Sequence, residues 1–239
     1  MSNHFLTSGI FLSIILFAVS CENSIMEPQF KADDYKNYFP AKTGQSFIYD
    51  LRFISIDAPS GIYDTSNYFI KEVFSEFFID NLGDSAIKIE RYIRETETDA
   101  WRSFDIWFAN VYEDELHVVE ENIRYVKLKN PVEEGNEWDG NKYNATDSLN
   151  LFNYSMQTIS SELINGILYD SVLTVLQRYD SSLIDKILFQ EKYAKNIGLI
   201  YKEKTTINSQ NPNVNIPIEN RITTGTIYKM SLISYTHAY

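Results

Sequence analysis

Apolar and polar residues alternate along short segments of the chain from Tyr38 onward, and these segments are rich in β-branched and aromatic side chains. The first segment runs from Phe47 to Phe53, with its apolar residues on one face and the charged residues Asp50 and Arg52 on the other. A period of two residues is typical of a β-strand that buries one face. The pattern therefore predicts a strand over 47–53.

The same alternation predicts a series of further strands. They are expected at 68–77, 87–93, 101–108, 116–128, 154–160, 168–179, 187–195, 199–207 and 226–235. A change of phase at Glu120–Asn122 indicates a bulge or a tight turn. The residues Asn196-Ile197-Gly198 indicate a hairpin turn, in which Gly198 is free to adopt a positive φ. All six prolines lie between the runs, as expected for a residue that donates no hydrogen bond to a sheet.

The segment Ser182–Lys195 fits two kinds of structure. Its apolar residues also recur at helical spacing, with Ser182 as a candidate N-cap. We expect a strand from Ile187 on, with a helical turn before it. No change of composition divides the chain and no repeat of fixed period is present, so residues 38–239 are expected to form a single antiparallel all-β domain. A barrel-like, a half-barrel and a sandwich form, with at most one short helix, all fit the pattern.

Residues 1–20 form a segment of another kind. They contain no Lys, Arg, Asp or Glu, and the apolar run from Ile10 to Val19 is interrupted only by Ser13. A membrane-spanning helix needs about 20 apolar residues, whereas the apolar region of a signal peptide has about 7 to 15. We therefore expect a signal peptide over 1–20, followed by a flexible tether over 21–37.

The single cysteine of the chain, Cys21, directly follows the small residue Ser20 at the end of this run. The sequence Ala18-Val19-Ser20-Cys21 resembles the lipobox of bacterial lipoproteins, in which a peptidase cuts before a cysteine that carries diacylglycerol. It departs from the usual pattern at Ala18, where Leu is commoner, and in lacking basic residues near the start. The resemblance implies that Cys21 is the lipid attachment site and anchors the mature chain to a membrane. The alternatives are an ordinary secretory signal with a coincidental cysteine, or an uncleaved anchor.

Two further segments resemble a known group of proteins. They are Tyr38-Phe39-Pro40-Ala41-Lys42-Thr43-Gly44 and the hairpin sequence YAKNIGLIYK of residues 193–202. Together they are similar to uncharacterised cell-envelope lipoproteins of the Bacteroidota. The resemblance implies an antiparallel, barrel-like or half-barrel fold and a lipid-anchored protein of the outer membrane, on either its periplasmic or its outer side. It brings no catalytic residues.

Charge and residue counts exclude several classes of function. The chain has 33 acidic and 21 basic residues and a formal charge of −12, whereas a nucleic-acid binder needs a cationic surface. Of the three histidines, His4 lies in the expected signal peptide, and His117 and His237 are far apart in the sequence. Acidic clusters such as Glu95–Asp99 lack the spacing of a calcium loop. We therefore assign no catalytic, cofactor-binding or metal-ligating residue.

The aromatic residues are the most prominent candidates for function. The chain has 17 Tyr, 15 Phe and 3 Trp, and the expected strands 68–77 and 101–108 are apolar on both faces. Such strands lie in a thick core, line a cavity or contact a partner. Trp101, Trp107 and Trp138 are the candidate ligand or partner contacts. Trp138 lies in a polar loop and is the best candidate for an exposed contact, although it could equally plug a barrel end.

Three functions fit these observations. The first is a non-enzymatic, lipid-anchored binding or assembly module of the cell envelope, which contacts the membrane through its anchor and binds a protein partner or a hydrophobic ligand. The second is a carrier of a lipid or another hydrophobic ligand in a β-barrel cavity. The third is an envelope hydrolase that uses paired carboxylates.

Overall fold

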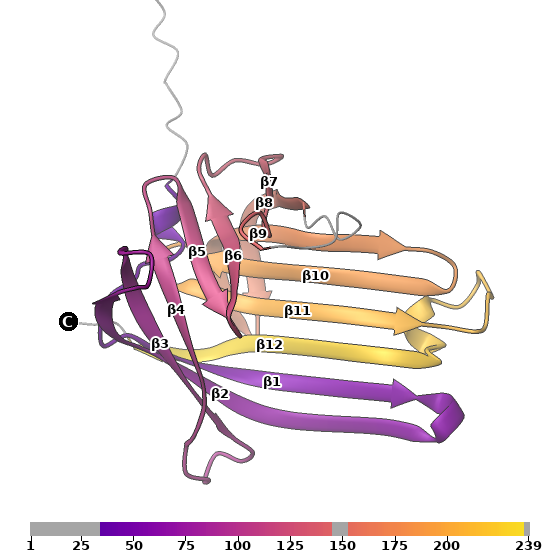
Figure 1. The fold of residues 1–239 in the computed structure, drawn as a ribbon. Coiled ribbons are helices and arrows are strands. Elements are labelled where there is room, and N and C mark those ends of the chain that lie inside the picture. Colours follow the sequence, from indigo (N-terminus) through magenta and orange to yellow (C-terminus); the bar gives the residue numbers. More distant parts are fainter. Residues whose placement is uncertain (1–33, 145–152, 237–239) are drawn as a thin grey trace, which may run out of the picture. The chain divides into compact units, whose positions relative to one another are not determined.

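A computed structural model describes residues 34–144 and 153–236. It confirms the all-β prediction, because twelve antiparallel strands in these residues form one sheet (Figure 1). The strands are β1 (Ser46–Asp57), β2 (Ile62–Ile79), β3 (Ser85–Arg94), β4 (Arg102–Val111), β5 (Glu115–Glu120), β6 (Ile123–Lys129), β7 (Glu137–Asp139), β8 (Asn153–Ile164), β9 (Ile167–Ser181), β10 (Asp185–Ala194), β11 (Gly198–Asn208) and β12 (Thr224–Thr236). Three short 3₁₀ turns accompany them, at η1 (Tyr35–Asn37), η2 (Ala58–Ser60) and η3 (Ile218–Asn220).

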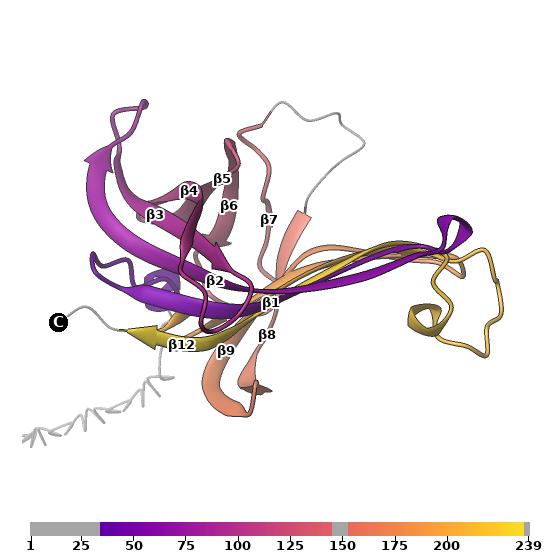
Figure 2. The ribbon, with the colours of Figure 1, turned by 90° about the horizontal axis from the view of Figure 1, so that it is seen from below.

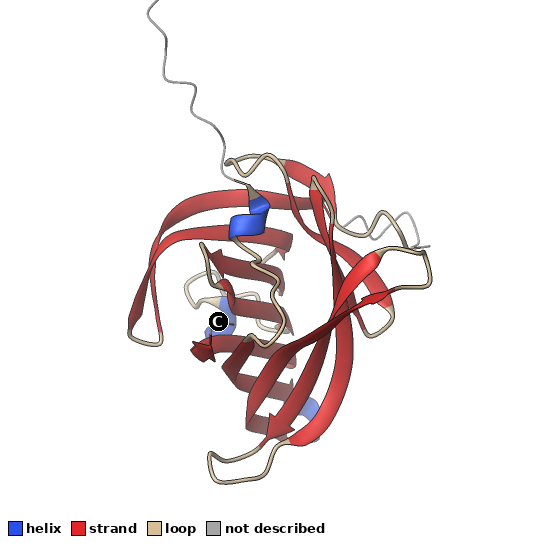
Figure 3. Cartoon of the chain, turned by 90° about the vertical axis from the view of Figure 1, so that its left-hand side faces the viewer, coloured by secondary structure: helices blue, strands red, loops and turns tan. Residues whose placement is uncertain are grey.

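The sheet curls into a nearly closed barrel (Figure 3). Consecutive strands are hydrogen-bonded neighbours except β6 and β7, which form the two edges of the sheet, and β1 pairs with β12. These edges meet at a seam, where the backbone N–H of Val126 donates to the carbonyl of Gly140 at 2.9 Å. The indole N–H of Trp138 donates to the carbonyl of Val126 at 2.8 Å. The seam thus satisfies part of the hydrogen bonding that open edges would leave exposed.

Unequal strand lengths divide the sheet into two parts. β2 has 18 residues and β9 has 15, whereas β5 has 6 and β6 has 7. The long strands therefore continue beyond the barrel as a flatter sheet, which Figure 2 shows from below. We call this part the sheet extension, and it comprises residues 53–66, 178–189, 204–208 and 224–228. The remaining strands and strand portions are called the barrel part.

Inward-facing apolar side chains fill the barrel part. Phe47, Tyr49 and Leu51 of β1 are buried, as the alternation predicts, while Asp50 and Arg52 are exposed. Other buried members of the same core come from strands on every side of the barrel, among them Ile70, Ile87, Leu116, Leu128, Met156, Leu173 and Leu232. Burial of this apolar surface is the main force that holds the sheet closed.

Two predicted turns are confirmed. Glu121 and Asn122, between β5 and β6, both have positive φ, of 51° and 66°. Two consecutive residues of this kind form the tight hairpin turn that matches the twist of the flanking strands. Between β10 and β11, Asn196 and Gly198 also have positive φ, and the N–H of Ile197 donates to the carbonyl of Ala194.

The helical turn expected before Ile187 is wrong. β10 begins at Asp185, and the hydroxyl oxygen of Ser182 accepts from the N–H groups of Ile184 and Asp185. Ser182 therefore caps a tight turn between two strands, a role that its side chain fills as readily as a helix cap. The short strand β7 is also absent from the prediction, which places Trp138 in a polar loop.

The folded part begins before the expected boundary at Tyr38. Tyr35 is fully buried, and its hydroxyl donates to the carbonyls of Tyr112 and Glu115 at 2.5 and 2.9 Å. The turn η1 therefore packs on the barrel, and residues 34–37 do not belong to a flexible tether. The remainder of the expected tether, the signal peptide and Cys21 lie outside the described residues. Within the described ranges, no helix is long and apolar enough to cross a membrane.

Candidate functional site: a cleft beside a buried ring of charges

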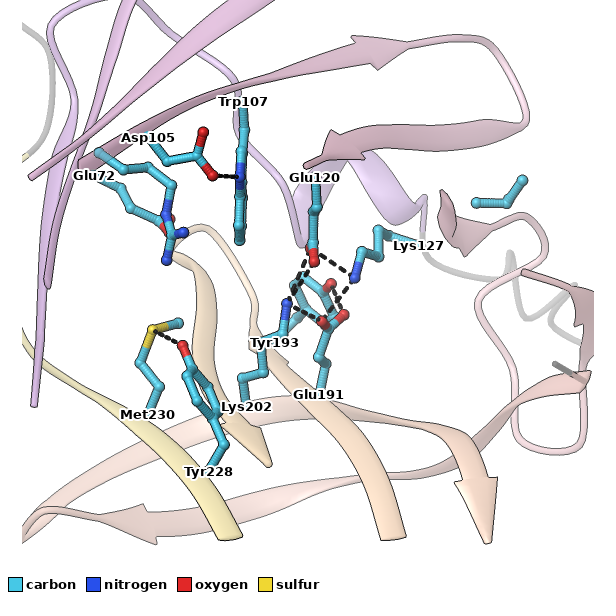
Figure 4. A network of polar contacts seen from close by, with 12 residues as sticks. Glu72, Asp105, Trp107, Glu120, Lys127, Glu191, Tyr193, Lys202, Tyr228 and Met230 are labelled. Atoms are coloured by element: carbon cyan, nitrogen blue, oxygen red, sulfur yellow. Dashed lines mark hydrogen bonds and ion pairs between the residues drawn. The ribbon is translucent and has the colours of Figure 1, made fainter. Parts of the chain in front are cut away.

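Four charged side chains form a closed ring inside the barrel part (Figure 4). Glu120 at the end of β5 and Lys127 of β6 lie on one wall, and Glu191 of β10 and Lys202 of β11 lie on the other. Lys127 Nζ lies 2.8 Å from Glu120 and 2.9 Å from Glu191. Lys202 Nζ lies 2.9 Å from Glu120 and 3.1 Å from Glu191. The ring thus alternates in sign and links two walls that are far apart in the sequence.

All four side chains are buried, and the ring keeps them ionised. Burial would raise the pKa of the Glu120 carboxyl, but the ammonium groups of Lys127 and Lys202 outweigh it and hold that pKa far below its usual value. The same two lysines overcome burial and lower the pKa of Glu191 to about 2. Burial would lower the pKa of Lys127, but Glu120 and Glu191 raise it. Paired charges of this kind avoid most of the cost of an isolated buried ion.

Neighbouring groups complete the environment of the ring. The hydroxyl of Tyr193 donates to Glu191 at 2.7 Å, and the indole N–H of Trp107 donates to Asp105 at 2.6 Å. The guanidinium carbon of Arg91 lies 3.6 Å from the centre of the Trp107 ring, a cation–π contact. Arg91 Nε also donates to Glu72 at 2.9 Å, and both side chains are buried.

The interior beside the ring has little free space. A cavity of about 40 Å³ is lined by Glu72, Glu120, Lys127 and Glu191 together with apolar side chains. This volume holds a few water molecules. The polar lining would give such waters hydrogen-bond partners, whereas the space is too small for an acyl chain.

A much larger hollow opens on the other side of Trp107. It is a cleft of about 350 Å³, where β4 and the β5–β6 turn overhang the sheet extension. Its wall is mainly aromatic and cationic, formed by Phe53, Phe104, Trp107, Phe189, Tyr228, Arg91, Lys202 and Lys204, with Leu51, Glu120, Glu121, Thr206 and Thr226 between them. We call this hollow the aromatic cleft.

The floor of the aromatic cleft is one cross-strand row of the sheet extension. Strand register places its members side by side in the order Phe53, Tyr228, Lys204, Phe189. Directly paired residues of antiparallel strands project from the same face. Lys204 is therefore flanked by aromatic side chains on both neighbouring strands.

Lys204 differs from the other lysines of the site because it has no acidic partner. Among the described residues, no carboxylate lies within 4.0 Å of its Nζ. Repulsion by Lys202, followed by burial, lowers the pKa of Lys204 to about 8. Glu121 also lines the cleft, but it is exposed at the turn, where water screens its charge.

The structure separates the three tryptophans that the sequence singles out. Trp107 lies at the aromatic cleft. Trp101 lies elsewhere, with Lys71 Nζ and Arg94 Cζ at 4.8 and 4.3 Å from its ring. Trp138 is only 7% exposed and lies at the seam. The prediction of an exposed contact at Trp138 is therefore wrong, because its indole N–H finds a backbone acceptor inside the barrel part. Cys21 lies outside the described residues.

The structure decides which face of strand β4 points inward. The sequence shows apolar residues on both faces of 101–108, and in the structure Trp107 is buried whereas Phe104 and Ile106 are exposed. A register shift between Arg91 and Tyr92 on the paired strand accompanies this arrangement. Because both faces of the segment are apolar, the alternation alone could not decide which face points inward.

The charged ring and Lys204 have no clear signal in the sequence. Lys127 stands between Val126 and Leu128, and all three are buried, so the strict alternation of a half-buried strand fails there. Lys202 and Lys204 share a face with buried Ile200, and this spacing is the one feature that could have indicated inward-facing lysines.

Comparisons with protein-family models, with curated proteins and with solved structures find no match. Among the described residues, no group of three or more His, Cys, Asp or Glu side chains is arranged to hold a metal ion. The site is therefore interpreted from its own geometry.

Proposed function

We propose that the chain is a lipid-anchored protein of the cell envelope, of the Bacteroidota type, whose β domain is a non-enzymatic binding module. The aromatic cleft is the binding surface in this proposal. The observation that carries it is the set of aromatic side chains around a hollow of about 350 Å³, among which Phe53 and Phe104 are exposed. This volume is within the range of small-molecule sites. Exposed aromatic faces at a concave site supply contact area at little cost in side-chain entropy.

The geometry favours this function over transport of a lipid inside the barrel. A carrier needs an internal cavity of the size of its ligand, whereas the cavity beside the ring has about 40 Å³. Buried apolar side chains from strands all around the barrel part pack together in one core cluster.

The ring also gives little support to a hydrolase with paired carboxylates. Such an enzyme needs one carboxyl that is protonated near neutral pH, and therefore a raised pKa. Lys127 and Lys202 outweigh burial and lower the pKa of both Glu120 and Glu191. These two carboxylates are committed to ion pairs, and in the proposal they support the cleft and do not react.

The binding surface is tested with a matched pair of variants of the full-length, membrane-anchored protein. Phe104 in the cleft and Phe77 on β2 outside it are 52% and 54% exposed. Small molecules that co-purify with the wild type, Phe104→Ala and Phe77→Ala are extracted and compared by mass spectrometry. We expect a compound that is lost with Phe104→Ala and retained with Phe77→Ala, whereas equal retention in both variants would contradict a binding role for the cleft.

The anchor is tested at Cys21. Cys21→Ala should leave the precursor unprocessed or release the protein from the membrane fraction, because no thiol remains to carry lipid. Metabolic labelling with a palmitate analogue should mark the wild type and not the variant. Undiminished labelling of the variant would contradict the proposed attachment site.

A further inference from the structure

The aromatic cleft contains one cation, Lys204, that forms no ion pair with a carboxylate of the described residues. Lys202 lies in the ring with two glutamates, and Arg91 pairs with Glu72. Lys204 has no such partner among the described residues. A half-buried cation with aromatic neighbours and no counterion has lost hydration without gaining a compensating pair. An anion placed in the cleft would supply that pair.

Arg91 adds further donors to the same wall. Its Nε atom is used by Glu72, but no hydrogen bond from either Nη atom is present among the described residues. Its guanidinium is held between Phe104 and Trp107, with ring-centre distances of 5.3 and 3.6 Å. The cleft therefore offers N–H groups on a rigid support, which suits an oxyanion.

The rest of the cleft has a different chemistry. Phe53, Phe189 and Tyr228 lie on its floor, and Phe104 and Trp107 lie on the overhanging wall. Aromatic surfaces on two sides favour a flat, apolar molecular body, which can stack against their rings. The combination of one cation without an ion-pair partner and aromatic walls is more specific than either feature alone.

Resting on the function proposed above, we infer that the ligand of the aromatic cleft is a small organic anion with a flat, ring-containing apolar body, whose acidic group pairs with Lys204. A carboxylate, a sulfonate and a phosphate share this chemistry. The inference names the class of ligand, and it assigns Lys204 as the residue that sets preference for anions over neutral molecules of the same shape.

Two fluorescent probes separate the two parts of this claim. 1-Anilinonaphthalene-8-sulfonate and N-phenyl-1-naphthylamine share one ring system, but only the first carries an acidic group. Their dissociation constants are measured for the wild type, Lys204→Met, Phe104→Ala and the control Lys229→Met. Lys229 lies on a neighbouring strand, is 48% exposed and lies 3.5 Å from Glu203. Thermal unfolding of each variant establishes that it is folded.

We expect Lys204→Met to weaken binding of the sulfonate probe by at least about tenfold, the usual effect of a charge-assisted contact, and to leave binding of the neutral probe within about twofold. Lys229→Met should change neither. Phe104→Ala should weaken both probes by about fivefold through loss of ring contact.

If Phe104→Ala weakens both probes but Lys204→Met changes neither, the cleft binds ligands and the inferred preference for anions is wrong. If neither variant changes the binding of either probe, the aromatic cleft is not a binding site, and the proposed function fails as well. If the probes are bound but Lys229→Met has the same effect as Lys204→Met, the preference reflects general surface charge and the assignment of Lys204 is overturned.

Discussion

Two lysines of the same strand show how the barrel part and the sheet extension differ. Lys202 lies inside the barrel part with glutamates at 2.9 and 3.1 Å. Lys204, two residues further along β11, lies in the sheet extension between Phe189 and Tyr228 without an acidic partner among the described residues. The opposite shifts of their pKa values follow from these surroundings. Burial would lower the pKa of Lys202, but Glu120 raises it, whereas Lys202 and burial both lower the pKa of Lys204.

The difference teaches which charges serve the fold and which are available for a ligand. Charges of the ring are mutually compensated and connect walls of the barrel part, so that removing one should damage the fold. Lys204 has no ion-pair partner among the described residues, and Glu120 and Glu191 offset the repulsion by Lys202 only in part, so removing its charge should spare or improve stability. Residues at functional sites often lower the stability of the folded protein in this way.

The largest expected loss of stability comes from removing one charge of the ring. Glu191→Gln keeps the shape of the side chain but leaves Lys127 and Lys202 with one glutamate between them. Loss of one member of a buried ion pair typically costs about 3–5 kcal/mol, and we expect this loss in the free energy of unfolding measured with urea. The control is Glu162→Gln, which removes the partly exposed pair with Lys192 and should cost less than about 1 kcal/mol. Equal losses in the two variants would show that the ring has no special role.

A substitution at the seam should lower the free energy of unfolding by an intermediate amount. Trp138→Phe keeps an aromatic ring but removes the N–H that donates to the carbonyl of Val126. An unsatisfied buried carbonyl costs about 1–3 kcal/mol, and we expect a loss of about 2 kcal/mol in the same urea experiment. Hydrogen exchange of the Val126 amide, which donates to Gly140, should also become faster. Unchanged exchange would indicate that the seam closes without Trp138.

Lys204→Met should change the free energy of unfolding by a smaller amount and should increase it. In the folded state the pKa of Lys204 is about 8, whereas an unfolded lysine has a pKa of about 10.4. At a pH between these two pKa values, the Lys204 side chain binds more protons in the unfolded state than in the folded state, so the free energy of unfolding rises with pH. Below about pH 8, the charge of Lys204 therefore lowers the stability of the folded protein. At pH 7 we expect the variant to be more stable by about 1 kcal/mol, or about 2–4 °C in Tm. A lower Tm at pH 7 would mean that Lys204 has a stabilising partner.

The smallest change in stability is expected for Phe104→Ala. Phe104 is 52% exposed in the cleft, and substitution of a residue exposed to this degree usually changes stability by about 0.5 kcal/mol or less. A calorimetric loss above about 2 kcal/mol would show that Phe104 belongs to the core and that the cleft is less open than described.

The sequence predicts the strands well because their signals are local. Alternation in 47–53 and the turns at Glu121–Asn122 and Asn196–Gly198 each depend on a few neighbouring residues, and the structure confirms all three. The beginning of β10 is predicted less well, since Ser182 favours a tight turn and a helix start through the same hydrogen bonds.

The candidate site could be predicted only in part, because it is made by pairing between distant strands. The aromatic content of the sequence singles out Trp107. The polar sequence around Trp138 indicates an exposed side chain, and only the contact between β6 and β7 at the seam buries it. The ring requires contacts between residues 64 to 82 positions apart, as for Lys127 with Glu191 and Lys202 with Glu120. No local pattern reveals which lysines of β11 find a glutamate across the barrel and which do not.

The most direct test of the central claim is the pKa of Lys204 itself, measured by NMR from the side-chain Cε resonance and assigned with Lys204→Arg. In the free protein we expect a pKa of about 8, and saturation with 1-anilinonaphthalene-8-sulfonate should raise it by more than about one unit, because a bound anion favours the charged form. N-phenyl-1-naphthylamine should not raise it. A pKa near the ordinary lysine value in the free protein, or one that the sulfonate probe leaves unchanged, would contradict the account.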